Sequence, residues 1–433
     1  MIKNQRMDRG GLGGYLRING LQVALVFFFC LLPLILPQVF TSRFALSMMS
    51  QMGIAIIFAL SYNMLLGQGG MLSFGHGAYY GLGGFIAMHA LNRISAGTLP
   101  LPLELLPIVG GLGGMAFGLL FGWLSTARAG VPFALISLGI GELIAASSLM
   151  IPSFFGGEQG ISGNRMVQMT LTGYRFGKSI EVYYLIAGWM LLSIGLMYLL
   201  TRTPLGRLAN AVRDNPERAP FIGYDTRTVR TFQFTLAAFF AGVAGGLYAI
   251  NYEIVTADTV GALTSANVLM MAYIGGVGHF FGPILGALLV SVMQLYVGSI
   301  SHAWLLYLGL LFVAIVMWAP NGLAGLVMMH GPFWKARLLH KLLPAYAWAG
   351  ATALVMFSGM MLLIEIIFHL SLSITPTSPM HLFGIAFSAY APMAWVLAVV
   401  LIIVGFLLFR PAARHVSHSW QEVTHMMKKG AAQ

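Results

Sequence analysis

The chain has 433 residues, of which 58% are apolar and only 8% are charged. A soluble domain carries about 25% charged residues, so this composition excludes a water-soluble protein. The net charge of +11 would suit a nucleic-acid-binding protein. However, the Lys and Arg residues fall in short clusters between apolar runs, which is the pattern of topology signals in membrane proteins. We therefore predict an all-α, polytopic helical membrane protein without a nucleic-acid partner.

Residues 1–20 form a basic arm with Lys3, Arg6, Arg9 and Arg17. The apolar run that follows is long for a signal-peptide core and lacks a cleavage site of small residues, so we expect a retained first helix. In chain order, apolar runs long enough to cross a bilayer predict about 12 spans. We expect these spans near residues 21–40, 45–66, 74–95, 103–126, 130–150, 182–201, 231–250, 262–278, 283–299, 304–319, 347–369 and 388–410.

The distribution of basic residues predicts the orientation of these spans. With the N-terminus inside, eighteen Lys and Arg residues lie in internal segments and five in external ones. Cytoplasmic loops of membrane proteins carry an excess of Lys and Arg. We therefore expect a multi-pass membrane protein with both termini in the cytoplasm and the bilayer as a constant partner.

Two connections are longer than helix packing requires: an external, glycine-rich stretch over 151–181 and an internal stretch over 202–230. After Pro320-Asn321-Gly322, basic residues precede two further spans. We predict three parts: the arm 1–20, a ten-helix core over 21–330 that contains the loop 202–230, and an appended two-helix hairpin with a basic tail over 331–433.

Glycine meets polar residues in two runs, residues 67–77 and residues 275–283. Such runs break helices, and broken backbone within a membrane is tolerated only where protein or a water-filled cavity satisfies it. Each run can line a cavity or form a tight turn at the membrane face, and the sequence leaves both interpretations open.

Motifs for catalysis are weak. The segment 173–179 looks like a phosphate-binding loop, but only three residues separate Gly173 from Gly177, whereas that loop requires four. No spacing of Cys and His suits a metal, and the histidines of the tail are explained by solvation. We predict that the chain is not an enzyme and has no metal site and no cofactor of its own.

Polar residues inside the spans are candidates for a translocation pathway. Glu142 lies midway along the fifth span, where an ionisable group is costly. It can line a pathway, contact another subunit or be satisfied in the interior. Glu365, in the hairpin, can hydrogen-bond a neighbouring helix or reach the interface. The remaining pathway candidates, each also explicable by interhelical hydrogen bonds, are Asn63, Gln68, Ser73, His76 and Asn267.

The internal loop 202–230 carries two helix start signals, Thr203-Pro204 and Asn215-Pro216, and Gly223 as a stop signal. A basic loop that only fixes topology or touches anionic lipid needs no paired helix starts. We therefore favour a docking surface for a cytoplasmic partner. Its candidate residues are Gly206, Arg207, Arg213, Asp214, Glu217, Arg218 and Gly223.

Five stretches in consistent order over residues 20–330 resemble the branched-chain amino acid permease family of ABC importers, which also includes urea and amide importers. They are residues 63–77 (beginning NMLLGQGG), 138–142 (LGIGE), 206–225 (beginning GRLANAVRDNPERA), 275–278 (GGVG) and 320–326 (PNGLAGL).

The resemblance implies a permease of the bacterial inner membrane that pairs with a second, similar permease. Two cytoplasmic ATPases would use the ATP, and a periplasmic solute-binding protein would deliver the substrate. Residues 206–219 would be the coupling helix that seats in one ATPase. Two features depart from the family pattern: Pro220, where the family continues the helix, and the hairpin 331–433. We expect uptake of a small amino acid or related polar solute by alternating access. A stand-alone secondary transporter or channel for such a solute is the alternative.

Overall fold

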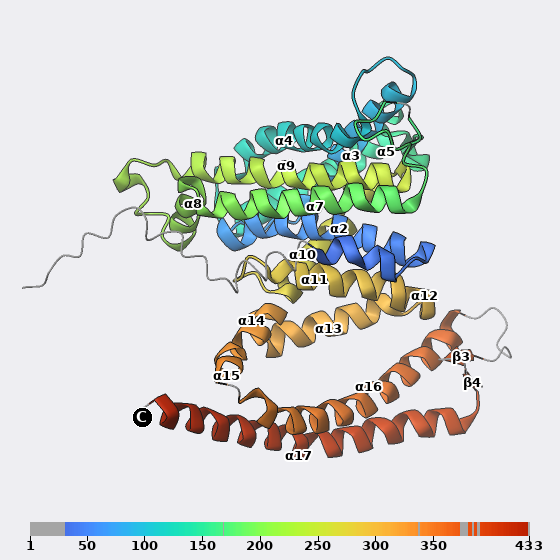
Figure 1. Cartoon of the computed structure of the whole chain (residues 1–433), viewed down its shortest axis with the longest axis vertical. Helices are drawn as coiled ribbons and strands as arrows, with labels where there is room; N and C mark the ends of the chain where they lie inside the picture. The colour runs from blue at the N-terminus through green and yellow to red at the C-terminus, as the bar shows by residue number, and fades with distance from the viewer. Residues whose placement is uncertain are drawn as a thin grey trace, which may run out of the picture.

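The computed structural model describes residues 31–167, 169–336, 338–372, 380–382, 385–387 and 390–431, so the predicted arm 1–20 lies outside the described residues. The described part is almost entirely helical (Figure 1). A helix covers residues 31–39, within the predicted first span. The helices that follow are α2 (Arg43–Asn63), α3 (His76–Ser95), α4 (Leu106–Ser125), α5 (Val131–Met150), α6 (Pro152–Phe155), α7 (Ser179–Arg202), α8 (Pro204–Asp214), α9 (Thr226–Tyr252), α10 (Ala262–Gly275), α11 (Gly282–Val292), α12 (Gly298–Ile300), α13 (Trp304–Trp318), α14 (Gly322–Met329), α15 (Gly331–Lys335), α16 (Leu343–Leu372) and α17 (Pro392–Ala431).

Two short antiparallel strand pairs complete the secondary structure of the described residues. Strand β1 (Ile161–Ser162) pairs with β2 (Ile254–Val255), which fastens the long connection after α5 to the end of α9. Strand β3 (Met380–Leu382) pairs with β4 (Ile385–Phe387) between α16 and α17.

Eight helical segments of the described residues are long and apolar enough to cross a membrane, and a bent pair, α13 with α14–α15, gives a ninth. The two parts of this pair meet at 49°. The chain is thus an all-α polytopic membrane protein, as predicted, but fewer helices than the predicted twelve qualify on length and composition. Helices α3 and α10 occupy two predicted spans without qualifying, and α10 has only 14 residues.

The chain between α2 and α3 turns back into the bundle, which explains why α3 is not a simple span. Helix α2 ends in a π-helical turn, Met64–Gln68, and the chain then doubles back along it. The ring of His76, at the start of α3, stacks on Phe58 with centroids 5.7 Å apart, and its Nε2 lies 3.0 Å from the Ser61 hydroxyl. Phe58 and Ser61 lie five and two residues before the end of α2, so at 1.5 Å per residue α3 begins about 3–8 Å inside that end.

Helix α10 begins inside the bundle in the same way. The chain after β2 forms a 3₁₀ turn, Ala257–Val260, which packs on α3. The hydroxyl of Ser265, in the first turn of α10, accepts a hydrogen bond of 2.9 Å from the N–H of Gly77. Two broken elements therefore meet between the membrane-spanning helices, and the Ser265 hydroxyl of one satisfies a backbone N–H of the other, as membrane-embedded irregular backbone requires.

Glycines allow α3, α4 and α9 to pack with their backbones in close contact. A Cβ on Gly245 of α9 would lie 1.9 Å from the carbonyl oxygen of Tyr80 on α3. A Cβ on Gly110 of α4 would lie 2.6 Å from the carbonyl oxygen of Gly242 on α9. Small residues have this role in membranes because lipid provides no hydrophobic drive for helix association. These three helices form the rigid centre of the core.

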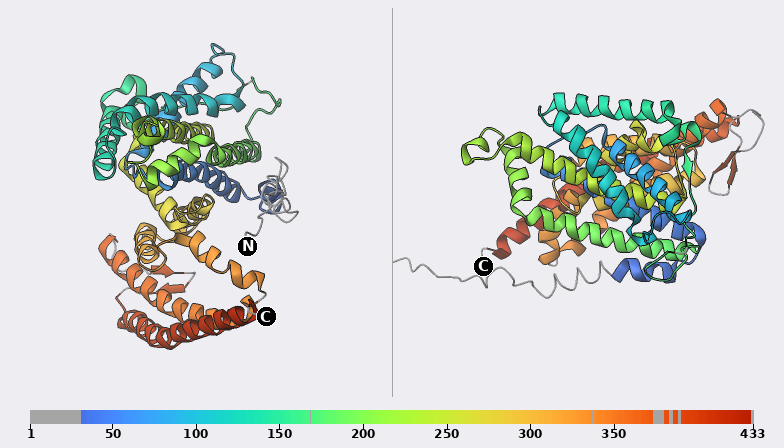
Figure 2. Two further views of the ribbon diagram at one scale, coloured as in Figure 1. Left: turned by 90° about the vertical axis from the view of Figure 1, so that its left-hand side faces the viewer. Right: turned by 90° about the horizontal axis from the view of Figure 1, so that it is seen from above.

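The long connections lie at opposite ends of the bundle (Figure 1). Helices α8 and α15 and the last turn of α17 lie at one end, which we call the α8 end. The connection between α5 and α7, helix α12 and the β3–β4 hairpin lie at the other. Helices α16 and α17 pack along each other and meet the remaining helices through α13–α15 (Figure 2). Helices α16 and α17 lie within the predicted segment 331–433, and its division from the core as a separate part stays a prediction.

Candidate functional site

Helix α8 begins where the sequence predicts. Thr203 is the N-cap residue, and its hydroxyl accepts a hydrogen bond of 3.4 Å from the N–H of Gly206. Pro204 occupies the first helical position, where its missing N–H costs nothing. The apolar face of α8 buries Ala209 and Val212 in a small cluster with Val229 of α9. These contacts fix α8 across the ends of α7 and α9.

The second helix start predicted in this loop is wrong. Helix α8 ends at Asp214, and the chain then forms a turn, a 3₁₀ segment (Pro220–Ile222) and a left-handed residue, Gly223, with φ of 84°. Pro216 disfavours helical backbone at the residue before it. The Asn215 side chain instead accepts a hydrogen bond of 3.2 Å from the N–H of Arg218. The predicted coupling helix 206–219 is therefore shorter and continues as a compact turn.

The tip of this loop is exposed. Glu217 and Arg218 are exposed, and the Phe221 side chain is 89% exposed, which is unusual for an aromatic residue outside a membrane-spanning segment. Beyond the tip, Asp225 caps α9, and the hydroxyl and N–H of Thr228 hold the pKa of its carboxyl below its usual range. A rigid scaffold thus presents an apolar side chain flanked by charges.

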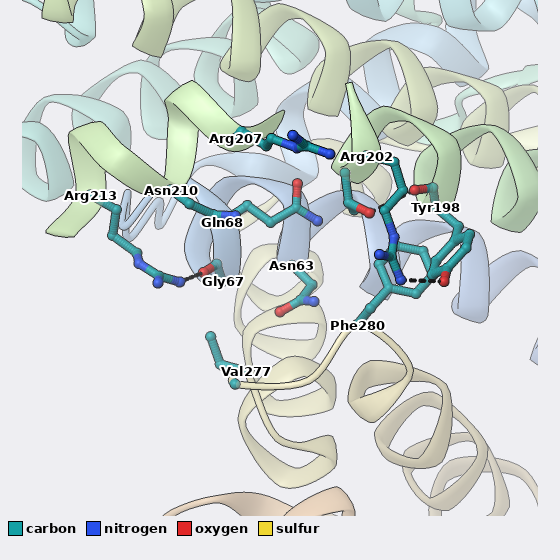
Figure 3. Close-up of a pocket in the computed structure, with 12 residues that line it drawn as sticks. Asn63, Gly67, Gln68, Tyr198, Arg202, Arg207, Asn210, Arg213, Val277 and Phe280 are labelled. Carbon is teal, nitrogen blue, oxygen red and sulfur yellow. Dashed lines mark hydrogen bonds between the residues drawn. The ribbon is translucent and has the colours of Figure 1, made fainter. Parts of the chain in front are cut away.

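A pocket of about 440 Å³ lies beneath α8 (Figure 3). Its walls come from the end of α2 with its π turn, the end of α7, α8 itself and the connection between α10 and α11. The charged and carboxamide side chains that line it are Asn63, Gln68, Arg202, Arg207, Asn210 and Arg213. The structure therefore brings together two predicted pathway residues, Asn63 and Gln68, and two predicted coupling residues, Arg207 and Arg213.

Hydrogen bonds tie α8 to the broken end of α2. The guanidinium of Arg213 donates to the carbonyl oxygen of Gly67, in the π turn, and its Nε donates to Asp214 at 2.8 Å. The Gln233 amide of α9 donates to the carbonyl oxygen of Met64 at 2.8 Å and lies 3.3 Å from Oε1 of Gln68. A displacement of α8 would therefore act directly on the end of α2.

The other predicted pathway residues lie elsewhere. Ser73 and His76 are buried where the chain turns back, and the Ser73 carbonyl oxygen accepts a hydrogen bond of 2.9 Å from the Tyr62 hydroxyl. Asn267 is half-buried on α10. Among the described residues, no partner binds the Ser73 hydroxyl or Oδ1 of Asn267. These residues surround the two broken elements rather than the pocket under α8.

Glu142 is exposed on α5. The opposite face of α5 packs on the break, where the Ser137 hydroxyl accepts a hydrogen bond of 3.0 Å from the N–H of Phe74. The side chain of Glu142 is thus not satisfied in the interior of this chain. An ionisable side chain in a span normally faces a bundle interior or a cavity, so this face of α5 requires a cavity or a second polypeptide.

Sequence reasoning did not single out three residues that have clear roles in the structure. Gln233 lies in a helix rich in small apolar residues, and its polarity between two phenylalanines was the available signal. In the sequence, Phe221 cannot be distinguished from other apolar residues, and only the structure shows that it is exposed. Glu104, at the start of the fourth span, accepts hydrogen bonds of 2.9 and 3.0 Å from the N–H groups of Leu171 and Thr172, and so fastens the connection 151–178.

Metal chemistry has no candidate among the described residues, since no three His, Cys, Asp or Glu side chains are grouped as metal ligands. The features that remain are an amphipathic helix with an exposed tip, polar helix breaks and an intramembrane carboxyl. They suit a transport protein.

Comparison with known proteins supports this interpretation. Residues 44–319 match the model of a family described as the branched-chain amino acid transport system permease component. The chain is 29% identical over 293 residues to the high-affinity branched-chain amino acid transport system permease protein LivM of Escherichia coli (strain K12), covering 62% of this chain and 67% of the relative.

More distant relatives are also permeases. The probable branched-chain amino acid transport permease protein LivH of Methanocaldococcus jannaschii is 28% identical over 228 residues, 51% of this chain and 70% of its own length. The fructose import permease protein FrcC of Rhizobium meliloti is 26% identical over 231 residues, 48% of this chain and 61% of its own. No solved structure matches the chain. Because the family model covers more than half of its length, the chain belongs to the family of branched-chain amino acid transport permeases.

Proposed function

We propose that this chain is one of two permease subunits of an ATP-driven importer that moves a branched-chain amino acid or a related small polar solute into the cytoplasm. Two ATPase subunits would bind at the α8 end and a periplasmic solute-binding protein at the opposite end. The excess of basic residues in segments at the α8 end supports its cytoplasmic placement. Both termini would then be cytoplasmic.

The observation that carries the proposal is the construction of α8 and its tip. Charged residues flank the 89% exposed ring of Phe221, and exposed aromatic side chains of this kind anchor protein interfaces. Behind this surface, Arg213 binds the π turn at the end of α2. Movement of a docked ATPase would thus pass through α8 to the break between α2 and α3.

The exposed face of α5 supports a second permease subunit. Glu142 lies on this face, and α5 packs on both broken elements through its other face. We infer that the two permeases meet around this region and enclose the solute pathway, because the carboxyl then faces a polar cavity instead of lipid. Ser73, His76 and Asn267, close to the same breaks, would be reached as the broken elements move.

Uptake in proteoliposomes tests the proposal. Vesicles that contain this chain, a partner permease, internal ATPases and ATP, with an external binding protein, are expected to accumulate radiolabelled leucine. The substitutions Arg218→Glu and Phe221→Ala should each reduce ATP-driven uptake by about tenfold or more, since loss of an interface anchor costs about 2 kcal/mol or more. Arg175→Glu and Tyr174→Ala, at exposed sites of the opposite end, should leave the binding of the ATPase subunits unchanged, whereas Arg218→Glu and Phe221→Ala should weaken it.

Two results would contradict the proposal. One is equal uptake by Arg218→Glu, Phe221→Ala and the unchanged chain. The other is uptake without ATP, driven by an ion or solute gradient, into vesicles that contain this chain alone. That result would identify a secondary transporter or channel.

A further inference from the structure

The pocket under α8 is rich in hydrogen-bond donors and has no counter-charge in its lining. Arg202, Arg207 and Arg213 contribute three guanidinium groups, and none of the described residues that line the pocket is acidic. Asp214 pairs with Arg213 from outside the pocket, where its side chain is 66% exposed. The lining therefore carries three positive charges, and two of them remain when the charge of Asp214 is counted against Arg213.

The three guanidinium groups differ in how many hydrogen-bond partners they have. Arg213 is held by Gly67 and Asp214, and Arg202 donates to the Tyr198 hydroxyl at 2.6 Å. The backbone N–H of Arg207 donates to the carbonyl oxygen of Thr203, but among the described residues no hydrogen bond or ion pair involves its guanidinium. Figure 3 shows Arg207 extending from α8 toward Arg202 across the pocket. Arg207 therefore offers its guanidinium donors to a ligand, and Arg202 offers those that the Tyr198 hydroxyl does not accept.

The floor of the pocket consists of buried carboxamides. The side chain of Asn63 is 2% exposed and that of Gln68 is 9% exposed. No described residue binds Oδ1 of Asn63, although this atom is buried. A buried polar group without a partner is costly. Because Oδ1 accepts hydrogen bonds, it requires a donor such as a water or a hydroxyl of the ligand, whereas Nδ2 of the same carboxamide is the group that can donate to a phosphate oxygen. The carboxamide of Asn63 comes from a wall different from that of the arginines, as expected of a built site.

We propose that this pocket binds a phosphate group, carried by a small metabolite or by a lipid headgroup, and that the bound group fastens α8 to α2 and α7. Guanidinium groups bind phosphate oxygens through paired, charge-assisted hydrogen bonds. A phosphate monoester carries close to two negative charges at pH 7 and can neutralise most of the surplus of positive charge, whereas a phosphodiester headgroup, with one charge, neutralises part of it. The volume of about 440 Å³ lies in the range of small-ligand sites.

The position of the pocket gives the ligand a regulatory effect. Arg207 and Arg213 belong to α8, Arg202 to the end of α7 and Asn63 to α2. A phosphate held by all three elements would resist movement of α8 relative to the core. This inference goes beyond transport itself, because binding occurs on the isolated chain and requires neither ATPase nor transported solute.

Binding to the purified, delipidated chain tests the inference. Inorganic pyrophosphate is the soluble probe, measured by calorimetry and by its effect on the thermal unfolding midpoint, with chloride at matched ionic strength as reference. We expect binding to the unchanged chain and to Arg175→Gln, a matched substitution at the other end. Arg207→Gln and Arg202→Gln should weaken binding by about 10- to 100-fold each, since a charge-assisted hydrogen bond contributes about 1.5–3 kcal/mol.

A second arm identifies the source of the phosphate. The chain is purified from vesicles of phosphatidylglycerol and its retained lipid is measured by native mass spectrometry. Retention of lipid that is lost in Arg207→Gln, without binding of pyrophosphate, would assign the site to a headgroup. The inference is overturned if neither probe binds, or if Arg207→Gln and Arg175→Gln bind both probes equally.

Discussion

At the scale of single residues, the chain has places where an added methyl group decides whether two segments can meet. Gly75 immediately precedes α3, where the chain turns back against α5. A Cβ at Gly75 would lie 2.1 Å from the carbonyl oxygen of Ser137, which is backbone and cannot move aside cheaply. The glycine is therefore required by the close approach of these two segments.

We predict that Gly75→Ala destabilises the chain by about 1–3 kcal/mol or more, because overpacking a filled site forces the backbone to shift. Gly139→Ala, on α5 with no atom within 4 Å of the added Cβ, is the matched control and should be neutral or slightly stabilising. The measurement is the thermal unfolding midpoint of each purified variant in the same detergent. Equal midpoints for both variants would show that the packing of the break is not as described.

At the scale of residues, the sequence predicted local structure correctly where a run of residues favours one backbone conformation. The glycine and polar run over 67–77 predicted a broken helix, and the structure contains one. The orientation of Glu142 could not be predicted, because α5 is apolar on nearly every face and its periodicity does not distinguish inside from outside. The exposure of Phe221 depends on where the loop ends in space.

At the scale of elements, the appended hairpin is joined to the core by a carboxyl group. Glu365 of α16 accepts hydrogen bonds from the hydroxyls of Ser301 and Tyr307, the latter at 2.8 Å. A second contact lies at the α8 end, where Trp420 of α17 packs on His330 with ring centroids 5.3 Å apart. The bond from Glu365 to a neighbouring helix, one of the two possibilities for this residue in the sequence, is thus present.

We expect Glu365→Leu to loosen the hairpin, since it leaves two hydroxyls without their acceptor at about 1–3 kcal/mol each when buried. Glu365→Gln keeps an acceptor oxygen and should preserve the contact. Hydrogen–deuterium exchange of α13 and α16 measures the difference, with faster exchange expected in Glu365→Leu alone. Ser358→Leu is the control, because the Ser358 hydroxyl is exposed and bonds only within its own helix. Unchanged exchange in Glu365→Leu would mean that this bond does not hold the hairpin.

At the scale of elements, a helix start signal in the sequence does not by itself decide whether a helix forms. Thr203-Pro204 and Asn215-Pro216 look alike in sequence, yet only the first begins a helix. Between Asn215 and Gly223 there is room for barely two turns, and Pro220 interrupts them. Ala209 and Val212 of α8 find an apolar surface on α9, so tertiary packing rather than the cap selects which start becomes a helix.

At the scale of the whole molecule, composition and charge predicted the fold class and the separation of the two long connections. They overestimated the number of simple spans, because a hydropathy pattern cannot tell a helix that crosses from one that begins inside the bundle. Helices α3 and α10 both begin inside. Such pairs are costly to build and are characteristic of transporters, where broken helices supply movable polar groups at the pathway.

The arrangement of the molecule joins these features in one line of contacts. The exposed tip follows α8, which carries Arg213. Arg213 binds the π turn at the end of α2, and the chain continues from that turn to the break at His76. This line of contacts supports the proposed coupling of an ATPase to the proposed pathway, and the proposed phosphate site lies directly beside α8.

Photo-crosslinking of the assembled importer tests this coupling most directly. A benzophenone derivative of phenylalanine replaces Phe221 in one preparation and Tyr174, an exposed aromatic residue at the opposite end, in another. After irradiation in vesicles, we expect position 221 to form a covalent product with an ATPase subunit and position 174 to form none with it. A product with the ATPase from position 174, or none from position 221 in a complex that still imports leucine, would contradict the proposed coupling.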